Sequence, residues 1–366
     1  MNNNPTVLEI DSGAIKHNLH YFKSKINADT KVLAVIKAFA YGSDAVEIAK
    51  ILEKERVDYL AVAYTGEGVT LRKANIQLPI LVLHPQIENF NTIIEFDLEP
   101  NLYNFSSLNH FINLISKINK INYPVHLKIN SGMNRLGFKE NDIPQLRTIL
   151  ENNHGLKFVS FYSHLAASEV QDEKEFTKQQ IDTFQIIGNR LAHVLNYKPL
   201  FHILNTSGII NYPSAQFDMV RLGIGLYGFS NEQKAIGKLK NVCNFKTAIS
   251  QIQTIEKGET VSYNRKFKAK KTSRIAILPV GYADGLKRNL SNSVGTVYLK
   301  DLEIPIVGTI CMDITMVDVT DIDCTVGDEV IIFNHQDHIL EFARKINTIS
   351  YEILTSISQR VKRRLI

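Results

Sequence analysis

The residues best suited to chemistry begin with one lysine, Lys37, which follows the apolar run Val32–Ile36. The run predicts a buried strand, and the glycine, serine and aspartate at 42–44 predict a turn into a helix. A lysine at the end of a buried strand is partly desolvated, which lowers its pKa and lets the amine form an imine with an aldehyde. Taken alone, such a lysine more often reaches water along its aliphatic stem than reacts.

Other polar residues stand where later apolar runs end. They are Lys128 and Arg135, His164, the segment Asn205-Thr206-Ser207-Gly208, and Arg221. Each has an ordinary explanation, such as a satisfied core histidine, a structural ion pair or a helix cap. Lys128 is harder to explain, because an unpaired buried charge is costly. If the runs are neighbouring strands of one sheet, all these side chains converge on one site.

Strand-like runs recur eight times, with helical patterns between most of them. The runs are Val32–Ile36, Tyr59–Ala63, Ile80–His84, Glu99–Tyr103, Val125–Ile129, Phe158–Ser163, Leu200–Leu204 and Met219–Ile224. The helical patterns are Ala45–Glu55, Glu67–Lys73, Ile87–Phe96, Ser106–Asn119, Gln145–Glu151 and Glu173–Leu195. The segment after Asn205 is too short to assign. This alternation predicts a (β/α)8 barrel, with chemistry at the C-terminal ends of the strands. A doubly wound open sheet is the alternative, but no Gly-x-Gly-x-x-Gly motif follows the first run.

The rhythm changes near residue 240, where short runs are separated by turn residues. The expected strands are Lys246–Ile255, Thr260–Tyr263, Ile275–Val280, Ser293–Leu299, Glu303–Val307, Thr315–Val319 and Glu329–Phe333, and a last helical stretch covers Ile339–Lys345 and Ser350–Ile357. We therefore predict an α/β chain with an N-terminal (β/α)8 TIM-type barrel over residues 11–240. A mainly β C-terminal domain covers residues 241–366 and takes in the N-terminal strand, residues 1–10.

Composition excludes several classes of protein. The net charge of +5 is spread along the chain except at residues 266–271 and 361–364, which we expect to be solvated surface. No basic face with interleaved aromatics predicts nucleic-acid binding. The cysteines Cys243, Cys311 and Cys324 lack metal-ligand spacing and fit a reducing compartment. Without a signal peptide or a membrane-length apolar run, the expectation is a cytoplasmic protein with no membrane or metal site.

The loops after the seventh and eighth strands are where such barrels commonly bind phosphate, through backbone N–H groups and small hydroxyl side chains. Here these loops contain Thr206 and Gly223. A phosphate there would stand in reach of the Lys37 amine. Pyridoxal 5′-phosphate (PLP) has both a phosphate and an aldehyde, so it is the cofactor this arrangement favours.

Residues 34–42 resemble the cofactor-lysine motif of the bacterial alanine racemase family. Further stretches resemble the same family in the same order: residues 127–137, 162–166, 221–228, 261–263, 280–285, 308–318 and 351–354. The resemblance covers nearly the whole chain, and the combination of motifs is specific where any single one is not. It implies a PLP-dependent amino-acid racemase that converts L-alanine to D-alanine for peptidoglycan.

The resemblance also implies roles for single residues. Lys37 would bind PLP and act as one of two acid/base groups. Tyr263, from the partner subunit of a head-to-tail homodimer, would act on the opposite face of the substrate Cα. A base on each face suits racemisation, which removes a proton from one side and returns it on the other. The phosphate would be held by Tyr41, Thr206, Gly223, Ile224 and Tyr351.

Around the pyridine ring, the resemblance implies that His164 packs beside the ring and that Arg221 bonds its nitrogen. Arg135 would contact the cofactor's phenolic oxygen and the substrate carboxylate, and the backbone at Met312 of the partner would also hold that carboxylate. In the family the lysine matching Lys128 can be carbamylated, which would make it a carboxylate that orients the arginine. Carbamylation would also remove the cost of burying its charge.

The chain departs from the family pattern at Phe39, Ser43, Asn264 and the pair Asn130-Ser131. None of these removes a named catalytic group, but they leave the strictness of alanine preference open. The near alternatives are a racemase of broader specificity or one for serine. A decarboxylase on the same architecture is disfavoured by the intact tyrosine motif and the lack of a cysteine in a matching acid position. A non-catalytic PLP-binding barrel would lack the second domain.

Overall fold

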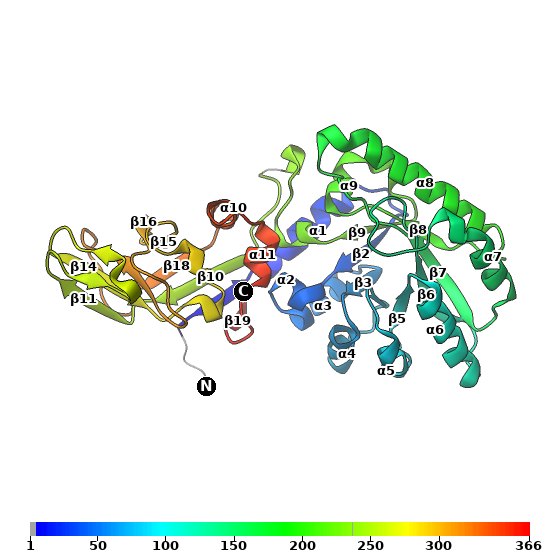
Figure 1. Cartoon of the computed structure of the whole chain (residues 1–366), viewed down its shortest axis with the longest axis horizontal. Helices are drawn as coiled ribbons and strands as arrows, with labels where there is room; N and C mark the ends of the chain where they lie inside the picture. The colour runs from blue at the N-terminus through cyan, green and yellow to red at the C-terminus, as the bar shows by residue number, and fades with distance from the viewer. Residues whose placement is uncertain (1–4, 236) are drawn as a thin grey trace.

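The computed structural model describes residues 5–235 and 237–366. The chain forms two lobes, a barrel at the right of Figure 1 and a β-rich lobe at the left, with the last two helices between them. Within the described ranges no helix is both long and apolar enough to cross a membrane.

Eight parallel strands form the barrel, in the order β8-β7-β6-β5-β4-β3-β2-β9. They are β2 (Lys31–Val35), β3 (Tyr59–Val62), β4 (Ile80–Val82), β5 (Glu99–Leu102), β6 (Tyr123–Lys128), β7 (Leu156–Tyr162), β8 (Leu200–His202) and β9 (Met219–Leu222). The ring closes between β8 and β9, where the Arg221 amide donates to the Leu204 carbonyl at 3.0 Å. The predicted barrel is confirmed, and each expected run forms its strand.

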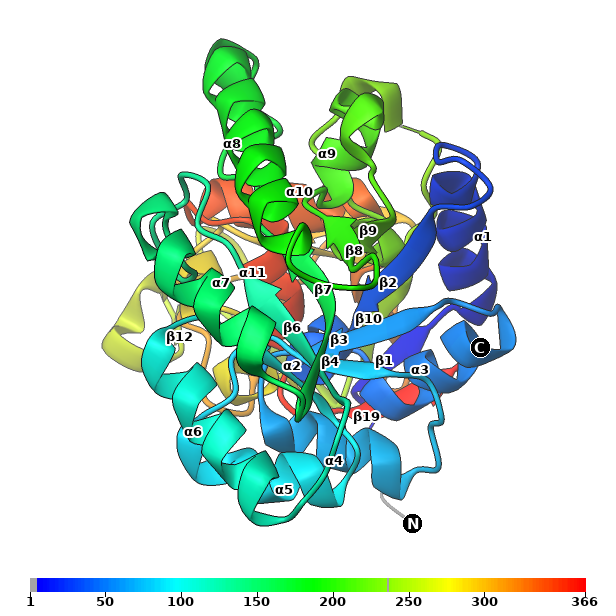
Figure 2. The same cartoon turned by 90° about the vertical axis from the view of Figure 1, so that its right-hand side faces the viewer.

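Helices surround the strands, as the end-on view of Figure 2 shows. They are α1 (Ser12–Lys23), α3 (Ala45–Lys54), α4 (Thr65–Lys73), α5 (Phe90–Glu95), α6 (Phe105–Lys117), α7 (Ile143–Asn152), α8 (Lys174–Ala192) and α9 (Thr206–Asn211). The short α2 (Lys37–Tyr41) lies near the centre of that view. The turn expected at residues 42–44 does lead into a helix, because the Asp44 side chain accepts hydrogen bonds from the first amides of α3. The segment left unassigned after Asn205 is α9, whose six residues are too few for a periodic pattern to register.

The second lobe holds a six-stranded sheet in the order β16-β15-β18-β10-β1-β19, a three-stranded sheet in the order β11-β14-β17, and the pair β12-β13. The strands are β1 (Val7–Ile10), β10 (Cys243–Ala248), β11 (Gln251–Ile255), β12 (Thr260–Val261), β13 (Phe267–Lys268), β14 (Ser273–Leu278), β15 (Thr296–Leu299), β16 (Leu302–Pro305), β17 (Thr315–Asp318), β18 (Glu329–Phe333) and β19 (Lys362–Leu365). The last helices are α10 (Gln336–Lys345) and α11 (Ser350–Thr355). Strand β1 pairs with β10 and β19, so the N-terminal segment lies in this lobe's sheet. Residues 1–4 of that segment lie outside the described residues.

The single strand expected over Lys246–Ile255 is wrong, because the chain changes sheets there. The Ile249 amide donates to the Asp328 carbonyl beside the larger sheet, and the next amide, of Ser250, donates to Ile277 in the smaller one. Strands β10 and β11 are therefore separate elements. Periodicity cannot locate such a crossing, because both halves are extended.

The prediction that residues 361–364 are solvated surface is right for Lys362 and Arg364, which are exposed, but wrong for Val361 and Arg363. Residues 362–364 belong to β19, which pairs in parallel with β1. The Arg363 guanidinium donates to the carbonyls of Gly42 at 2.8 Å and Ser43 at 3.1 Å, and to three carbonyls in the segment before it. A long arginine side chain can bury its head where carbonyls converge, and local charge patterns do not reveal that. The lysines at 266–271 are exposed as expected.

Candidate active site

A cavity of about 540 Å³ opens at the C-terminal ends of the barrel strands. The expected site residues that line it are Lys37, Tyr41, Lys128, Arg135, His164, Thr206, Arg221, Gly223, Ile224 and Tyr351. All but Tyr351 come from the strands and loops of the barrel. Tyr351 is the second residue of α11, which packs against α2 and so brings a side chain from the end of the chain to the barrel mouth.

Lys37 begins α2, a single turn with an unusual backbone. Residues 38–41 all have φ between 52° and 56°, so this turn is left-handed. Left-handed geometry is costly for residues with a Cβ, at roughly 1–2 kcal/mol each. Gly42 ends the turn at φ 84°, where an added Cβ would lie 2.1 Å from the carbonyl oxygen of Leu354. The turn therefore depends on its neighbours.

Glu67 of α4 supports this turn from the next barrel unit. One carboxylate oxygen accepts the Ala38 amide at 2.6 Å, and the other accepts the Ala63 amide at 2.7 Å and the Tyr64 amide at 3.1 Å. Burial lowers the pKa of Lys37, the positive charge of Arg135 lowers it further, and Glu67 partly offsets both. The desolvation expected from the sequence is thus present, and the amine is a better nucleophile than a surface lysine.

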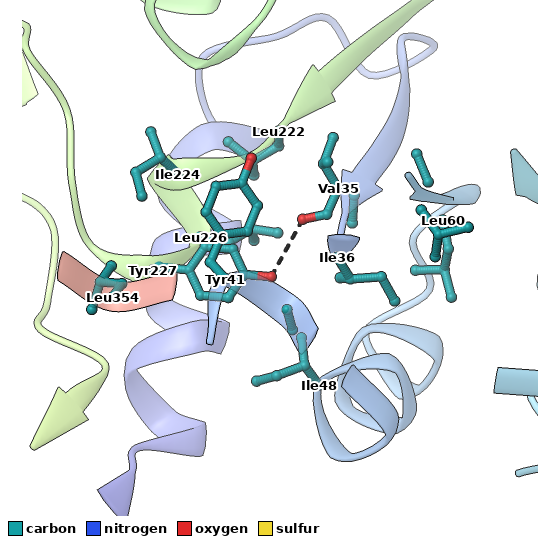
Figure 3. Packing of buried hydrophobic residues seen from close by; sticks show 14 of the residues in the cluster. Val35, Ile36, Tyr41, Ile48, Leu60, Leu222, Ile224, Leu226, Tyr227 and Leu354 are labelled. Carbon is teal, nitrogen blue, oxygen red and sulfur yellow. Dashed lines mark hydrogen bonds between the residues drawn. The ribbon is translucent and has the colours of Figure 1, made fainter. Parts of the chain in front are cut away.

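One corner of the cavity is built by aromatic packing, shown in Figure 3. The Tyr41 ring stacks on Tyr227 with centroids 4.6 Å apart, and the Tyr227 hydroxyl donates to the Val35 carbonyl at 3.3 Å. Gly223 lies so close that an added Cβ would be 2.7 Å from the Tyr41 hydroxyl oxygen. Burial raises the pKa of Tyr41 above its ordinary range and that of Tyr351 to about 12. Both phenols stay protonated at neutral pH and can donate hydrogen bonds to an anion.

Thr206 ties the loops after β8 and β9 together at this corner. Its hydroxyl oxygen accepts the amides of Gly223 and Gly225, each at 3.3 Å. An added Cβ on Gly225 would lie 2.5 Å from the Phe22 ring, so these loops approach α1 closely only with glycine there. The corner therefore presents hydroxyl groups and closely packed backbone, which suits a phosphate.

Arg221 lies deep in the cavity among neutral histidines. Its Nη1 donates to His202 Nδ1 at 2.8 Å, and its Nη2 donates to the Ser163 carbonyl at 2.6 Å and to His164 Nδ1 at 3.0 Å. Burial lowers the pKa of Arg221 to about 10, so it stays charged at neutral pH. Burial, followed by the charge of Arg221, holds the pKa of both histidines well below the usual range. Within the described residues, no acceptor takes the Arg221 Nε–H.

Lys128 is the buried charge that the sequence left unexplained. It is 8% exposed, and its amine lies 4.3 Å from the centre of the Tyr162 ring. Burial lowers its pKa well below the ordinary value, and the charges of Arg221 and Arg135 act in the same direction. In the part of the chain that the structure describes, no carboxylate pairs with it. Burial and the two arginine charges both enlarge the fraction of neutral, nucleophilic amine relative to a surface lysine.

Tyr263 and Met312 do not join the other site residues within one chain. Their side chains are 67% and 54% exposed on the β-rich lobe, and neither lines the cavity. Ser262 and Asn264, on either side of the tyrosine, have φ values of 66° and 61°. Asn264 stands where the family usually has glycine, and asparagine tolerates this conformation better than most residues with a side chain.

The other departures from the family pattern leave the cavity lining unchanged. Phe39 is 55% exposed, and Ser43 is buried against Cys243 with its hydroxyl 3.3 Å from the sulfur. Neither lines the cavity. Asn130 accepts two amides of the following loop, from Gly132 and Asn134, and so shapes the segment that presents Arg135.

Sequence reasoning missed several residues that complete the site. Tyr162 stacks on His202 with centroids 4.8 Å apart and covers the Lys128 amine, and Tyr227 supports Tyr41. Asn101 and Tyr64 also line the cavity. Polar or aromatic residues at strand ends were the available signal, but it does not say which of them face inward.

Comparisons with known proteins agree with this geometry. Residues 10–231 match the family model for the alanine racemase N-terminal domain, and residues 242–365 match that for the C-terminal domain. Alanine racemase 1 of Caldanaerobacter subterraneus subsp. tengcongensis is 37% identical over 98% of this chain and 94% of its own length. The alanine racemase of Thermodesulfovibrio yellowstonii is 36% identical over 98% of this chain and 97% of its own.

Solved structures give the same answer. Alanine racemase of Clostridium difficile 630 superposes with a TM-score of 0.94 at 34% identity, covering 100% of this chain and 97% of that one. The enzyme from Bartonella henselae, with covalently bound pyridoxal phosphate, has a TM-score of 0.88 at 31% identity, and 99% of each chain is covered. Both family models and whole-length relatives therefore agree, and the chain belongs to the alanine racemase family.

Proposed function

We propose that this protein interconverts L-alanine and D-alanine with PLP as cofactor, by a two-base mechanism. The observation that carries the proposal is the Lys37 amine, whose pKa is lowered by burial, in a cavity shared with Arg221 and a corner of hydrogen-bond donors. An aldehyde within reach of the amine and a phosphate in that corner fit one cofactor. In the cell, D-alanine produced in the cytoplasm would supply peptidoglycan.

The residues present fit PLP. The protonated phenols of Tyr41 and Tyr351, with Thr206 and the backbone at Gly223 and Ile224, would hold the phosphate. The unused Nε–H of Arg221 would meet the ring nitrogen, and His164 would pack beside the ring. When bound, PLP delocalises the negative charge that proton removal leaves on the substrate Cα. Because an arginine does not protonate the ring nitrogen, this delocalisation is moderate, and we infer that it limits side reactions such as transamination.

The two protons are assigned to Lys37 and Tyr263. A neutral lysine takes or returns a proton on one face of the Cα, and a tyrosine serves the other face. The exposed position of Tyr263, outside its own chain's cavity, supports its supply by a second copy. We therefore propose a head-to-tail homodimer in which each site takes Tyr263 and the Met312 backbone from the partner.

Arg135 and Lys128 would orient the substrate. Arg135 lies at the exposed side of the cavity and would contact the substrate carboxylate and the cofactor's phenolic oxygen. Burial lowers the pKa of Lys128 and so favours the neutral amine, the form that would react with carbon dioxide to give a carbamate. Its negative charge would hold the Arg135 guanidinium in place and would balance Arg221.

We also propose the domain limits expected from the sequence, with the barrel over residues 11–240 and the β domain over residues 241–366 plus 1–10. The pairing of β1 with β10 supports the placement of the N-terminal strand in the second domain.

Mixing two inactive variants tests the shared site. Lys37→Ala should remove the absorbance band of covalently bound cofactor and nearly all racemisation in a chiral assay with L-alanine. Tyr263→Phe should keep the band and lose racemisation. In a mixed dimer, the site formed by the intact Lys37 of one chain and the intact Tyr263 of the other should be active. Activity should therefore return when the two variants are unfolded and refolded together.

Two outcomes would contradict the proposal. Wild-type turnover by the Lys37→Ala variant would remove the lysine from the mechanism. No recovery in mixtures that form heterodimers would show that the two residues act within one chain. Turnover of L-serine or L-lysine at rates matching L-alanine would favour the broader-specificity alternative, and cofactor binding without any racemisation would favour the non-catalytic one.

A further inference from the structure

The barrel interior holds a series of hydrogen-bonded polar side chains, of which the proposed mechanism uses only the last, Arg221. One residue from each of five neighbouring strands, β5 to β9, contributes to it: Glu99, His126, Ser160, His202 and Arg221. None is more than 8% exposed, and His126, Ser160 and His202 have no exposed surface. Burying polar groups is costly unless each one has a hydrogen-bond partner. A continuous series of such groups through the barrel core is therefore stable only if every member is paired.

The contacts are short and unbroken. Glu99 Oε2 lies 2.7 Å from His126 Nε2, and His126 Nδ1 lies 2.6 Å from the Ser160 hydroxyl. The same hydroxyl lies 2.9 Å from His202 Nε2, and His202 Nδ1 lies 2.8 Å from Arg221 Nη1. The chain thus runs from the first residue of β5, at the start of its strand, to the arginine at the floor of the cavity.

With Glu99 ionised and both histidines neutral, one arrangement of protons satisfies every link and also gives the Ser160 hydroxyl proton an acceptor. Arginine donates and never accepts, so His202 Nδ1 must be the unprotonated acceptor and its Nε2–H must donate to Ser160. The Ser160 hydroxyl then donates to His126 Nδ1, and His126 Nε2–H donates to Glu99. A carboxylate, which only accepts when ionised, is the group that suits this far end. The reversed order would turn an N–H of His202 toward the guanidinium.

We propose that Glu99, His126 and Ser160 are positioning residues, which fix the tautomer of His202 and thereby the orientation of the Arg221 guanidinium toward the cofactor. The role for the cofactor rests on the proposed function. The assignment of the His202 tautomer does not rest on the proposed function, because the hydrogen bonds that fix it are all within the protein. If the relay holds His202 Nδ1 as an acceptor, Arg221 keeps its Nη groups on protein acceptors and leaves Nε–H for the ring nitrogen.

Cutting the chain at its middle tests the relay. Ser160→Ala removes the hydroxyl that links His126 to His202. Glu99→Gln replaces a carboxylate, which only accepts when ionised, with an amide that can also donate. Ser273→Ala is the matched control, because it removes a buried strand hydroxyl, bonded to the Lys271 carbonyl at 2.9 Å, from the other lobe. Thermal melting of each variant checks that it folds.

The first readout is the ¹⁵N spectrum of the histidines in the full-length protein, with and without PLP. Wild type and Ser273→Ala should show His202 protonated at Nε2 alone. Ser160→Ala and Glu99→Gln should each show a mixture of the two tautomers. The signal is assigned by its loss in His202→Asn. An unchanged single tautomer in folded Ser160→Ala would overturn the relay, whether or not the protein racemises alanine.

The second readout is function. Ser160→Ala should weaken PLP binding by about threefold to tenfold, as the loss of one buried hydrogen bond predicts, and should lower kcat with little change in the KM for L-alanine. Adding Glu99→Gln to the Ser160→Ala variant should change nothing further, because the link between them is already cut. Fully additive effects in this double-mutant cycle would overturn the relay and leave two independent structural residues.

Discussion

Replacing Glu67 with glutamine should loosen the turn that carries Lys37. Residues 38–41 adopt left-handed geometry at a combined cost of about 4–8 kcal/mol, which surrounding contacts must offset. Glu67 accepts three amides, one of them from Ala38 inside that turn. A glutamine side chain has one acceptor oxygen, so it can serve either Ala38 or the pair at Ala63 and Tyr64, but not both.

The magnitude follows from the bond that is lost. A hydrogen bond to a charged group contributes about 1.5–3 kcal/mol, and water can reach the exposed Ala38 amide, so we expect a loss of about 1–3 kcal/mol. The fraction of molecules in which the turn is open should therefore rise by about fivefold to 140-fold. Chemical denaturation measures the loss in the free energy of unfolding of the whole protein. The rate at which the apoprotein attaches PLP through Lys37 measures the loosening of the turn itself.

The charge of Glu67 also acts on the lysine, and pH separates the two effects. Glu67 raises the Lys37 pKa, so its removal lowers that pKa further and increases the neutral amine near pH 7. At alkaline pH, where the amine is neutral in both proteins, only the structural effect remains and the variant should react more slowly. Glu53→Gln is the control, since Glu53 accepts the loop amides of Gln77 and Leu78 at 2.8 and 3.3 Å, away from the turn. Wild-type stability together with a wild-type alkaline rate in Glu67→Gln would refute the reasoning.

Three further outcomes are expected. Lys128→Met should stabilise the protein in buffer free of carbon dioxide. The pKa of Lys128 is lower in the folded protein than in the unfolded chain, so the unfolded chain binds the extra proton and the stability of the wild type rises with pH toward 10.5. The stability advantage of methionine should therefore shrink as the pH approaches that value. Melting curves across pH measure this, and a stability gain with bicarbonate in wild type alone would report the carbamate. Arg363→Met should lower the free energy of unfolding by about 2–4 kcal/mol, because five carbonyls lose a charged donor. Denaturant titration measures this loss, and an unchanged unfolding midpoint would contradict it. Gly42→Ala should prevent the close approach to Leu354 and reduce soluble expression or PLP attachment; a variant with normal values for both would disprove the packing argument.

Much of the barrel follows from sequence because its signals are local. Apolar runs such as Val32–Ile36 and Ile80–His84 alternate with amphipathic helices, and each pattern spans a single element. The same local rule puts Lys37, His164 and Arg221 at strand ends, where the barrel brings them together. The family motifs then name a cofactor that periodicity alone could only favour.

Several features lie beyond local patterns because they depend on distant partners. The left-handed turn at residues 38–41 is held by Glu67 and ends at Gly42, close against the Leu354 carbonyl, and neither neighbour is marked in the sequence. The strand at 362–365 forms because β1 offers an edge, and Arg363 is buried because carbonyls from two ends of the chain meet there. The break between β10 and β11 exists only because two sheets lie side by side.

The sequence by itself determined the elements, the barrel class and most of the residues at the mouth, because hydrophobic periodicity and residue type are properties of short segments. Only the tertiary structure decided their electrostatics. Among the residues described, it buries Lys128 with no carboxylate partner. It lowers the pKa of Lys37 and links Glu99 to Arg221 through three other strands. It also leaves Tyr263 exposed on the second lobe, away from its own chain's cavity. These properties depend on how far each group is removed from water and on which charges share its surroundings, and both are set by packing.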